Sequence, residues 1–160
     1  MRIAKALLAT LIVSLATPAF ADQANMDKAI NAAFKSYHDG GIEGMYQDAR
    51  LCTTGVDFAS RTESPAKRAE YCGAFEYTGF LILDAYDKLK DAGYFQAVGV
   101  LHRVGVNLER AGTINSPQQL NEYLVSHFGY VRAKVLARLP VPSTSATVCG
   151  HDCASRSAKQ

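Results

Sequence analysis

The stretch from Ser64 to Gly93 constrains the fold most, because its pattern predicts one long helix with both ends marked. Ser64 can cap the first backbone amides, and Pro65 suits the first helical position, where its missing N–H costs nothing. Gly93 can adopt the left-handed conformation that ends many helices. Apolar and small residues recur along the stretch every three or four positions, which is the period of one helix face: Ala69, Cys72, Phe75, Gly79, Leu83, Tyr86 and Leu89.

Two glycines inside this predicted helix indicate how it packs. Gly73 and Gly79 each weaken an isolated helix by about 1 kcal/mol relative to alanine. This cost is offset if another helix packs closely against the two glycines, where no side chain stands in the way. We therefore expect a neighbouring helix to pack tightly against this stretch.

The first 21 residues are expected to be a secretory signal peptide rather than part of the fold. A basic start precedes an apolar core over residues 6–16, and Ala19-Phe20-Ala21 forms a small-x-small cleavage site. The apolar core is shorter than the roughly 20 residues that span a bilayer. We therefore expect the mature chain to begin at Asp22 and to reside in the bacterial periplasm.

The charge balance of the mature chain argues against two classes of partner. Arg2 and Lys5 leave with the signal, so 15 of the 17 basic residues remain against 15 acidic ones. A nucleic-acid-binding protein would carry a basic stripe, and a membrane-surface protein would carry a basic amphipathic helix. We expect neither nucleic acid nor, after removal of the signal, a membrane as partner.

Four cysteines in an exported chain predict two disulfide bonds. They are Cys52, Cys72, Cys149 and Cys153, and three pairings are open. We favour Cys52–Cys72 together with Cys149–Cys153, and Cys72–Cys149 is the main rival pairing. A Cys52–Cys72 bond would close a loop of about twenty residues and contribute roughly 3 kcal/mol in the chain-entropy model.

The rest of the chain completes an all-α protein. Gly40-Gly41 separates two short helices near the N-terminus, and the capping box Ser116-Pro117-Gln118-Gln119 opens the last helix. Alternating valines after residue 97 would also suit a strand, but the length of that segment and Gly112 beyond it favour a helix. Besides the central helix, we expect helices at residues 25–38, 42–52, 94–111 and 116–139. Residues 22–140 then form a compact, disulfide-braced bundle of about five helices, and residues 141–160 form a polar tail.

No motif in the sequence points to catalysis. A Gly-x-Ser-x-Gly elbow, a phosphate-binding loop and a His-Glu-x-x-His zinc motif are all absent from the sequence. His102 and His127 fall within predicted helices near apolar faces, where histidine usually has a structural role. We expect neither an enzyme nor a cofactor.

One dense cluster of metal-ligand residue types lies in the tail. Cys149, His151 and Cys153 could together hold a soft ion such as Cu(I). The alternative is a short structural disulfide with an exposed histidine between its cysteines. We favour the disulfide, because the sequence upstream supplies no clear additional ligand.

Three stretches resemble a known family. The first is GMYQDARLC, which ends at Cys52, and the second is Tyr71-Cys72-Gly73-Ala74-Phe75, followed by Gly79 and Asp84. The third is SPQQLNEYLVSHFGYVRAKVLARL over residues 116–139. Their order and spacing resemble those of exported helical immunity proteins of the Rap/Tai type, which protect bacteria from cell-wall amidase toxins delivered by type VI secretion.

The resemblance implies a protein that acts by binding. The partner would be a peptidoglycan amidase toxin, and a loop of this chain would block the toxin's substrate groove without any catalytic residue. Two loops could do so, Thr53–Glu63 and Ala111–Asn115, and we favour the first, with Asp57, Phe58 and Arg61 as contacts. A periplasmic copper-binding protein, a structural periplasmic protein without a ligand, and a homodimer remain open alternatives.

Overall fold

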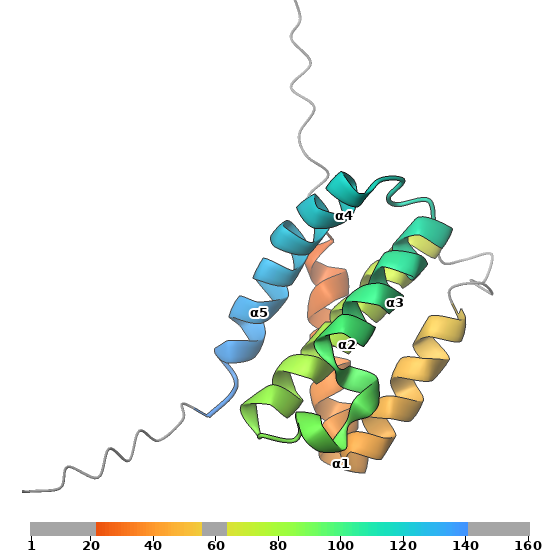
Figure 1. Cartoon of the computed structure of the whole chain (residues 1–160). Coiled ribbons are helices and arrows are strands. Elements are labelled where there is room, and N and C mark those ends of the chain that lie inside the picture. The colour runs from red at the N-terminus through yellow and green to blue at the C-terminus, as the bar shows by residue number, and fades with distance from the viewer. Residues whose placement is uncertain (1–21, 56–63, 141–160) are drawn as a thin grey trace, which may run out of the picture.

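A computed structural model describes residues 22–55 and 64–140, and every regular element in these residues is helical. The fold is therefore all-α, as the sequence predicts (Figure 1). No helix in these two ranges combines the length and apolar character needed to cross a membrane. The elements are α1 (Gln23–Gly55), α2 (Pro65–Ala85), η1 (Leu89–Asp91), η2 (Gly93–Phe95), α3 (Ala97–Arg110), α4 (Pro117–Tyr123), the π-helical turn η3 (Leu124–Phe128) and α5 (Gly129–Leu136).

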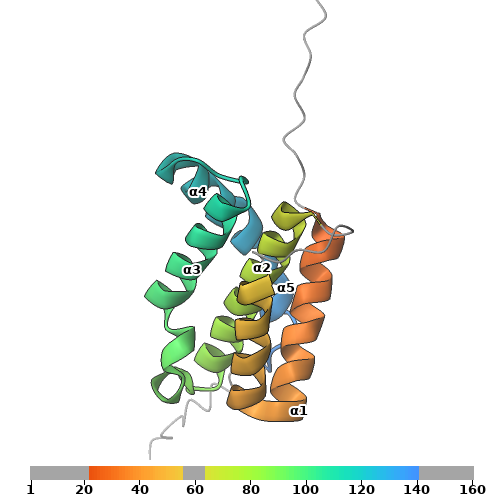
Figure 2. The same cartoon turned by 90° about the vertical axis from the view of Figure 1, so that its right-hand side faces the viewer.

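The first element, α1, is a helical hairpin. Its backbone leaves helical geometry at Gly41, where φ is 62° and ψ is −150°. The two arms, residues 23–40 and 42–55, consequently run antiparallel to each other (Figure 2). The break at Gly40-Gly41 predicted from the sequence is confirmed, because glycine alone adopts a positive φ without steric cost.

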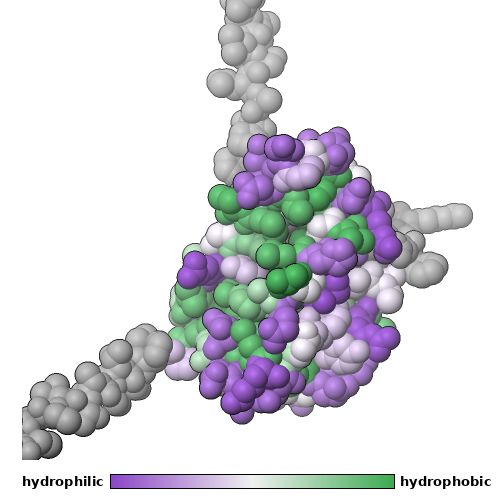
Figure 3. All heavy atoms as spheres, viewed as in Figure 1, coloured by the Kyte–Doolittle hydropathy of each residue, from purple (hydrophilic) through white to green (hydrophobic). Residues whose placement is uncertain are grey.

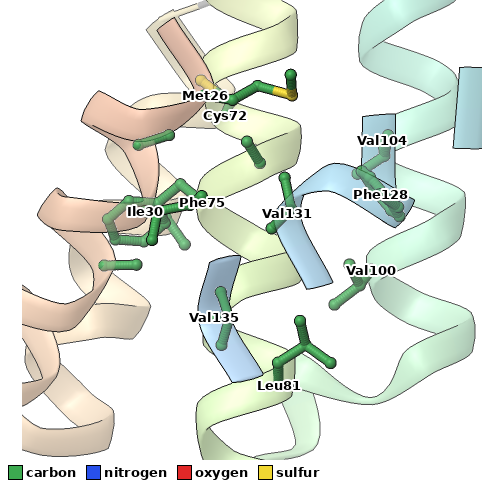
Figure 4. Packing of buried hydrophobic residues seen from close by; sticks show 14 of the residues in the cluster. Met26, Ile30, Cys72, Phe75, Leu81, Val100, Val104, Phe128, Val131 and Val135 are labelled. Atoms are coloured by element: carbon green, nitrogen blue, oxygen red, sulfur yellow. The ribbon is translucent and has the colours of Figure 1, made fainter. Parts of the chain in front are cut away.

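The central element is α2, which is surrounded on several sides. The arms of α1 pack along one side, and α3 and α5 pack on the other (Figures 1 and 2). Figure 4 shows Ile30 and Phe75 between α1 and α2, and Val100 and Val131 between α2 and the two outer helices. The sequence pattern predicts a helix with one buried face, and this is wrong: α2 also buries Glu70, Glu76 and Thr78.

The position at which the central helix ends is a correction to the sequence analysis. The helix stops at Ala85, eight residues before Gly93, and Tyr86 is 43% exposed rather than part of the core. Asp87 adopts the left-handed conformation, with φ at 53°, and the Lys88 amide donates a hydrogen bond to the Leu83 carbonyl oxygen at 2.8 Å. This is a Schellman cap in which aspartate occupies the position that glycine usually takes.

The later helices follow the prediction in outline and differ in detail. The segment that begins at Ala97 is helical rather than extended, and it ends at Arg110, two residues before Gly112, whose φ is 69°. Ser116 caps α4 by accepting a hydrogen bond from the Gln119 amide at 3.3 Å. The single last helix predicted over residues 116–139 is instead three segments, α4, η3 and α5, because a π-helical turn interrupts it.

The predicted disulfide and close packing are both present. Cys52 and Cys72 are bonded, with their Cα atoms 5.5 Å apart, whereas Cys149 and Cys153 lie outside the described residues. A Cβ atom built on Gly73 would lie 3.3 Å from Val104 of α3. One built on Gly79 would lie 2.6 Å from the ring of Phe95. Close packing at both glycines is thus confirmed.

Candidate functional site

An apolar groove lies between α2, α3 and the π-helical turn. It encloses about 320 Å³, and no charged side chain lines it. Figure 3 shows apolar surface between α5 and α3 in the same view as Figure 1. We call this hollow the apolar groove, and its lining residues are Tyr77, Phe80, Ala97, Val100, Leu101, Leu124, Val125 and Phe128.

Aromatic rings form part of the lining of the apolar groove. The ring of Tyr77 stacks on Phe128 with centroids 4.0 Å apart and planes inclined by 7°. The centroid of the Phe80 ring lies 6.0 Å from that of Tyr77, and the two planes are inclined by 13°. The three nearly parallel rings join α2 to η3, and they present flat apolar surface with little rotational freedom.

The outer wall of the apolar groove is the π-helical turn. Within it, the Ser126 hydroxyl donates to the Glu122 carbonyl oxygen at 2.8 Å, a local bond of the kind that competes with regular helix geometry. The turn leaves Val125 at the groove wall although this side chain is 71% exposed. Single π turns inside helices are frequently found at functional sites.

Two polar groups lie beside the apolar groove. Arg132 follows Phe128 by one helical turn, and it is close enough to Tyr77 to affect its titration. Burial raises the pKa of the Tyr77 phenol, and the positive charge of Arg132 opposes that rise. Among the described residues, neither the Tyr77 hydroxyl nor the Arg132 guanidinium has a hydrogen bond or an ion pair. The groove is therefore apolar, with an exposed cation and a half-buried hydroxyl beside it.

A second cluster joins η3 to the starts of α1 and α2. The Glu70 carboxylate accepts a hydrogen bond from the Asn25 amide at 2.9 Å and lies 3.7 Å from Nε2 of His127. The His127 ring stacks on Tyr123 with centroids 3.8 Å apart, and burial lowers the pKa of this histidine. The expectation of a structural role for His127 agrees with these contacts, because the ring bridges buried groups of three helices.

The neighbouring Ser126 invites comparison with a catalytic serine. Its Oγ lies 2.7 Å from Nδ1 of His127, which lies in turn beside Glu70. A serine nucleophile needs its hydroxyl hydrogen directed at the imidazole. Here Oγ lies within hydrogen-bond distance of the Glu122 and Tyr123 carbonyl oxygens, and Nδ1 lies 3.0 Å from the same Tyr123 oxygen. The cluster thus resembles a helix-stabilising network more closely than an activated nucleophile.

A buried carboxylate network braces the opposite side of α2. Glu76 is 1% exposed and accepts hydrogen bonds from Arg103 at 2.8 Å, from Thr53 at 2.9 Å and from the Tyr94 hydroxyl at 3.1 Å. The Arg103 guanidinium also covers the Tyr94 ring at 3.6 Å from its centroid. Burial raises the pKa of Glu76. Three donors occupy the carboxylate, so the network is closed and joins α1, α2, η2 and α3.

The site residues predicted from the sequence fall largely outside the described residues. Asp57, Phe58 and Arg61 belong to residues 56–63, and Cys149, His151 and Cys153 belong to residues 141–160. Within residues 22–55 and 64–140, no group of three or more His, Cys, Asp or Glu side chains could hold a metal ion. The rival loop, Ala111–Asn115, carries Ile114 into the core and exposes Thr113 and Asn115.

The apolar groove is the feature that sequence reasoning missed. The structure leaves two apolar side chains of α3 exposed, Val98 at 82% and Leu101 at 40%, and Leu101 lines the groove. Comparison with known proteins adds no further identification: no protein-family model, curated protein or solved structure matches this chain. Function must therefore be argued from the residues and their geometry.

Proposed function

We propose that this protein is an exported periplasmic immunity protein that binds a cell-wall amidase toxin and blocks the toxin's substrate groove. One observation supports the proposal: the helix ends on either side of residues 56–63 are held in fixed positions. The Cys52–Cys72 disulfide ties the end of α1 to α2, and a Cβ atom on Gly55 would lie 3.0 Å from the Arg68 side chain. The segment between them therefore departs from a rigid base.

A rigid base matters because of the energetics of inhibition. Protection at nanomolar affinity requires about −12 kcal/mol of binding free energy. Each side chain or loop that must be ordered on binding subtracts from that value, so anchored loop ends favour tight binding. Phe58 and Arg61 belong to residue types that dominate binding energy in protein interfaces, and Asp57 adds a charge that can pair with a basic toxin surface.

The test uses the oxidised mature chain, beginning at Asp22, against purified amidases of the type VI secretion class. We expect one of them to lose its activity on peptidoglycan sacculi at an equimolar amount of this protein. Failure to inhibit any amidase, with the helical fold intact by circular dichroism, would refute the immunity proposal.

Loop variants test the contact residues separately from the function. Phe58→Ala and Arg61→Glu should each weaken toxin binding without lowering the melting temperature. Leu51→Ala is the matched control, because Leu51 is a large exposed apolar side chain near the end of α1, just before residues 56–63. Unchanged binding by both loop variants would move the contact surface away from residues 56–63.

The copper-binding alternative is separated from the proposal by a thiol assay on non-reduced protein. Cys149 and Cys153 would titrate as two free thiols if they served a metal with His151, and they would not titrate if they formed a disulfide. Two free thiols would favour Cu(I) binding by the tail over a structural disulfide.

A further inference from the structure

We propose that the apolar groove binds a free long-chain carboxylate, with the hydrocarbon chain along the groove and the carboxylate beside Tyr77 and Arg132. This binding site is separate from residues 56–63, so the inference does not rest on the proposed immunity function. Either of the two can fail while the other holds.

The size and lining of the apolar groove fit a hydrocarbon chain. Its volume of about 320 Å³ lies at the lower end of the range typical of small-molecule sites. Every lining residue is aliphatic or aromatic. Leu101 and Val125 form opposite walls and are 40% and 71% exposed, so a chain between them would remove apolar surface from water on both sides. Such burial is the main source of affinity for an apolar ligand.

The charge beside the apolar groove selects the head group. Arg132 carries a positive charge, and it has no ion pair among the described residues. The Tyr77 ring stacks on Phe128, four residues before Arg132, and its hydroxyl, which has no hydrogen bond among the described residues, can donate a second hydrogen bond to the head group. Neither a carboxylate nor a cation lines the groove itself, so the charge of Arg132 beside Tyr77 favours an anionic head group over a cationic one.

A free amphiphile fits better than an acyl chain held in a membrane. Peripheral membrane binding depends on a basic amphipathic helix. The chain from Asp22 onward carries equal numbers of basic and acidic residues. Arg132 is a cation beside the groove, because its positive charge affects the pKa of the lining residue Tyr77. The groove therefore offers a site for one anion and little attraction to an anionic lipid surface.

The first experiment measures binding of decanoate to the oxidised mature protein by isothermal titration calorimetry below the micelle concentration. We expect saturable binding of one decanoate per chain. Each buried methylene should tighten binding by up to about fourfold, so octanoate should bind up to about fifteenfold more weakly. Decyltrimethylammonium, which has the same chain and a cationic head, should bind more weakly than decanoate.

Three variants separate the head group from the chain. Arg132→Gln should weaken decanoate binding about threefold to tenfold and leave binding of 1-decanol unchanged. Val125→Asp should weaken both ligands, and it should fold normally because Val125 is an exposed side chain. Lys28→Gln is the control: it removes an exposed cation on α1, and no residue of α1 lines the groove. This variant should bind decanoate and 1-decanol as tightly as the wild type does.

Several results would overturn the proposal. Folded protein that shows no saturable decanoate binding would overturn the proposal. Sedimentation would then show whether a second copy of the chain covers the groove. Equal affinity for decanoate and decyltrimethylammonium would remove the role of Arg132. Binding to phosphatidylglycerol vesicles without binding of free decanoate would assign the apolar surface to a membrane instead.

Discussion

Replacing Gly79 with alanine tests whether the close packing around α2 is as tight as the structure indicates. The new Cβ atom would lie 2.6 Å and 3.0 Å from two ring carbons of Phe95, and 3.1 Å from the sulfur of Met45. Favourable contacts between carbon atoms require about 3.5–4.0 Å, so the Phe95 ring must shift by roughly 1 Å. Phe95 and Met45 are both fully buried and have no solvent-filled space to enter.

The expected change in stability follows from two opposing terms. Overpacking a close-packed core costs about 1–3 kcal/mol, and the contact at 2.6 Å places Gly79→Ala near the upper end of that range. Alanine regains about 1 kcal/mol of helix propensity. The net result is a loss of about 2 kcal/mol in the free energy of unfolding, or a decrease of about 6–8 °C in melting temperature for a chain of this size.

Two other glycines provide matched controls. An alanine Cβ at Gly73 would lie 3.3 Å from Val104, so packing cost and helix propensity should nearly cancel. At Gly129, the first residue of α5, a Cβ would have no neighbour within 4 Å, so alanine should stabilise the protein by about 1 kcal/mol. Urea denaturation of the oxidised mature variants measures all three. The reasoning would be refuted if Gly79→Ala had the same free energy of unfolding as the wild type, or if Gly73→Ala lost more of it than Gly79→Ala.

Two further predictions concern the disulfide and the half-buried histidine. Reducing the Cys52–Cys72 bond, whose cysteines are 20 residues apart, should cost about 3 kcal/mol and lower the melting temperature by about 10 °C, whereas a Cys52→Ala/Cys72→Ala variant should not respond to reductant in this way. Because burial lowers the pKa of His127 below its ordinary 6.5, the unfolded chain binds this proton more tightly, so stability should fall as the pH drops below about 6.5. His127→Gln should lessen that fall between pH 6.5 and pH 5, and a wild type that gains stability on acidification relative to the variant would contradict the assignment.

The parts of the fold that could be predicted from the sequence are those fixed by local chemistry. Gly41 and Gly112 adopt positive φ at the positions where the sequence predicts helix ends. Ser116 caps α4, as its capping-box motif predicts. Asp87 ends α2 in the same conformation, but aspartate adopts it much less often than glycine. The next glycine after Gly79 is Gly93, so the sequence predicts a helix that extends to Gly93.

The parts that could not be predicted depend on packing between distant segments. The π-helical turn at Leu124–Phe128 leaves no local mark that distinguishes it from a regular helix. The buried Glu76 resembles any helical glutamate in the sequence, and only the folded chain brings Arg103 and Tyr94 to it. The apolar groove likewise depends on where α3 and η3 lie on α2. A periodic pattern shows which residues are apolar and does not show which of them a neighbour leaves uncovered.

The arrangement of the outer helices around α2 has a consequence for how the molecule folds and opens. The arms of α1 and the central helix are tied by the disulfide and packed along their lengths, whereas α3 and α5 each pack mainly on α2 rather than on each other (Figure 1). Structural units with few mutual contacts can unfold locally without global unfolding. We therefore expect the hairpin and α2 to stay folded longest. Either outer wall of the apolar groove, α3 or η3 together with α5, can then detach transiently while the hairpin and α2 keep the ends of residues 56–63 fixed.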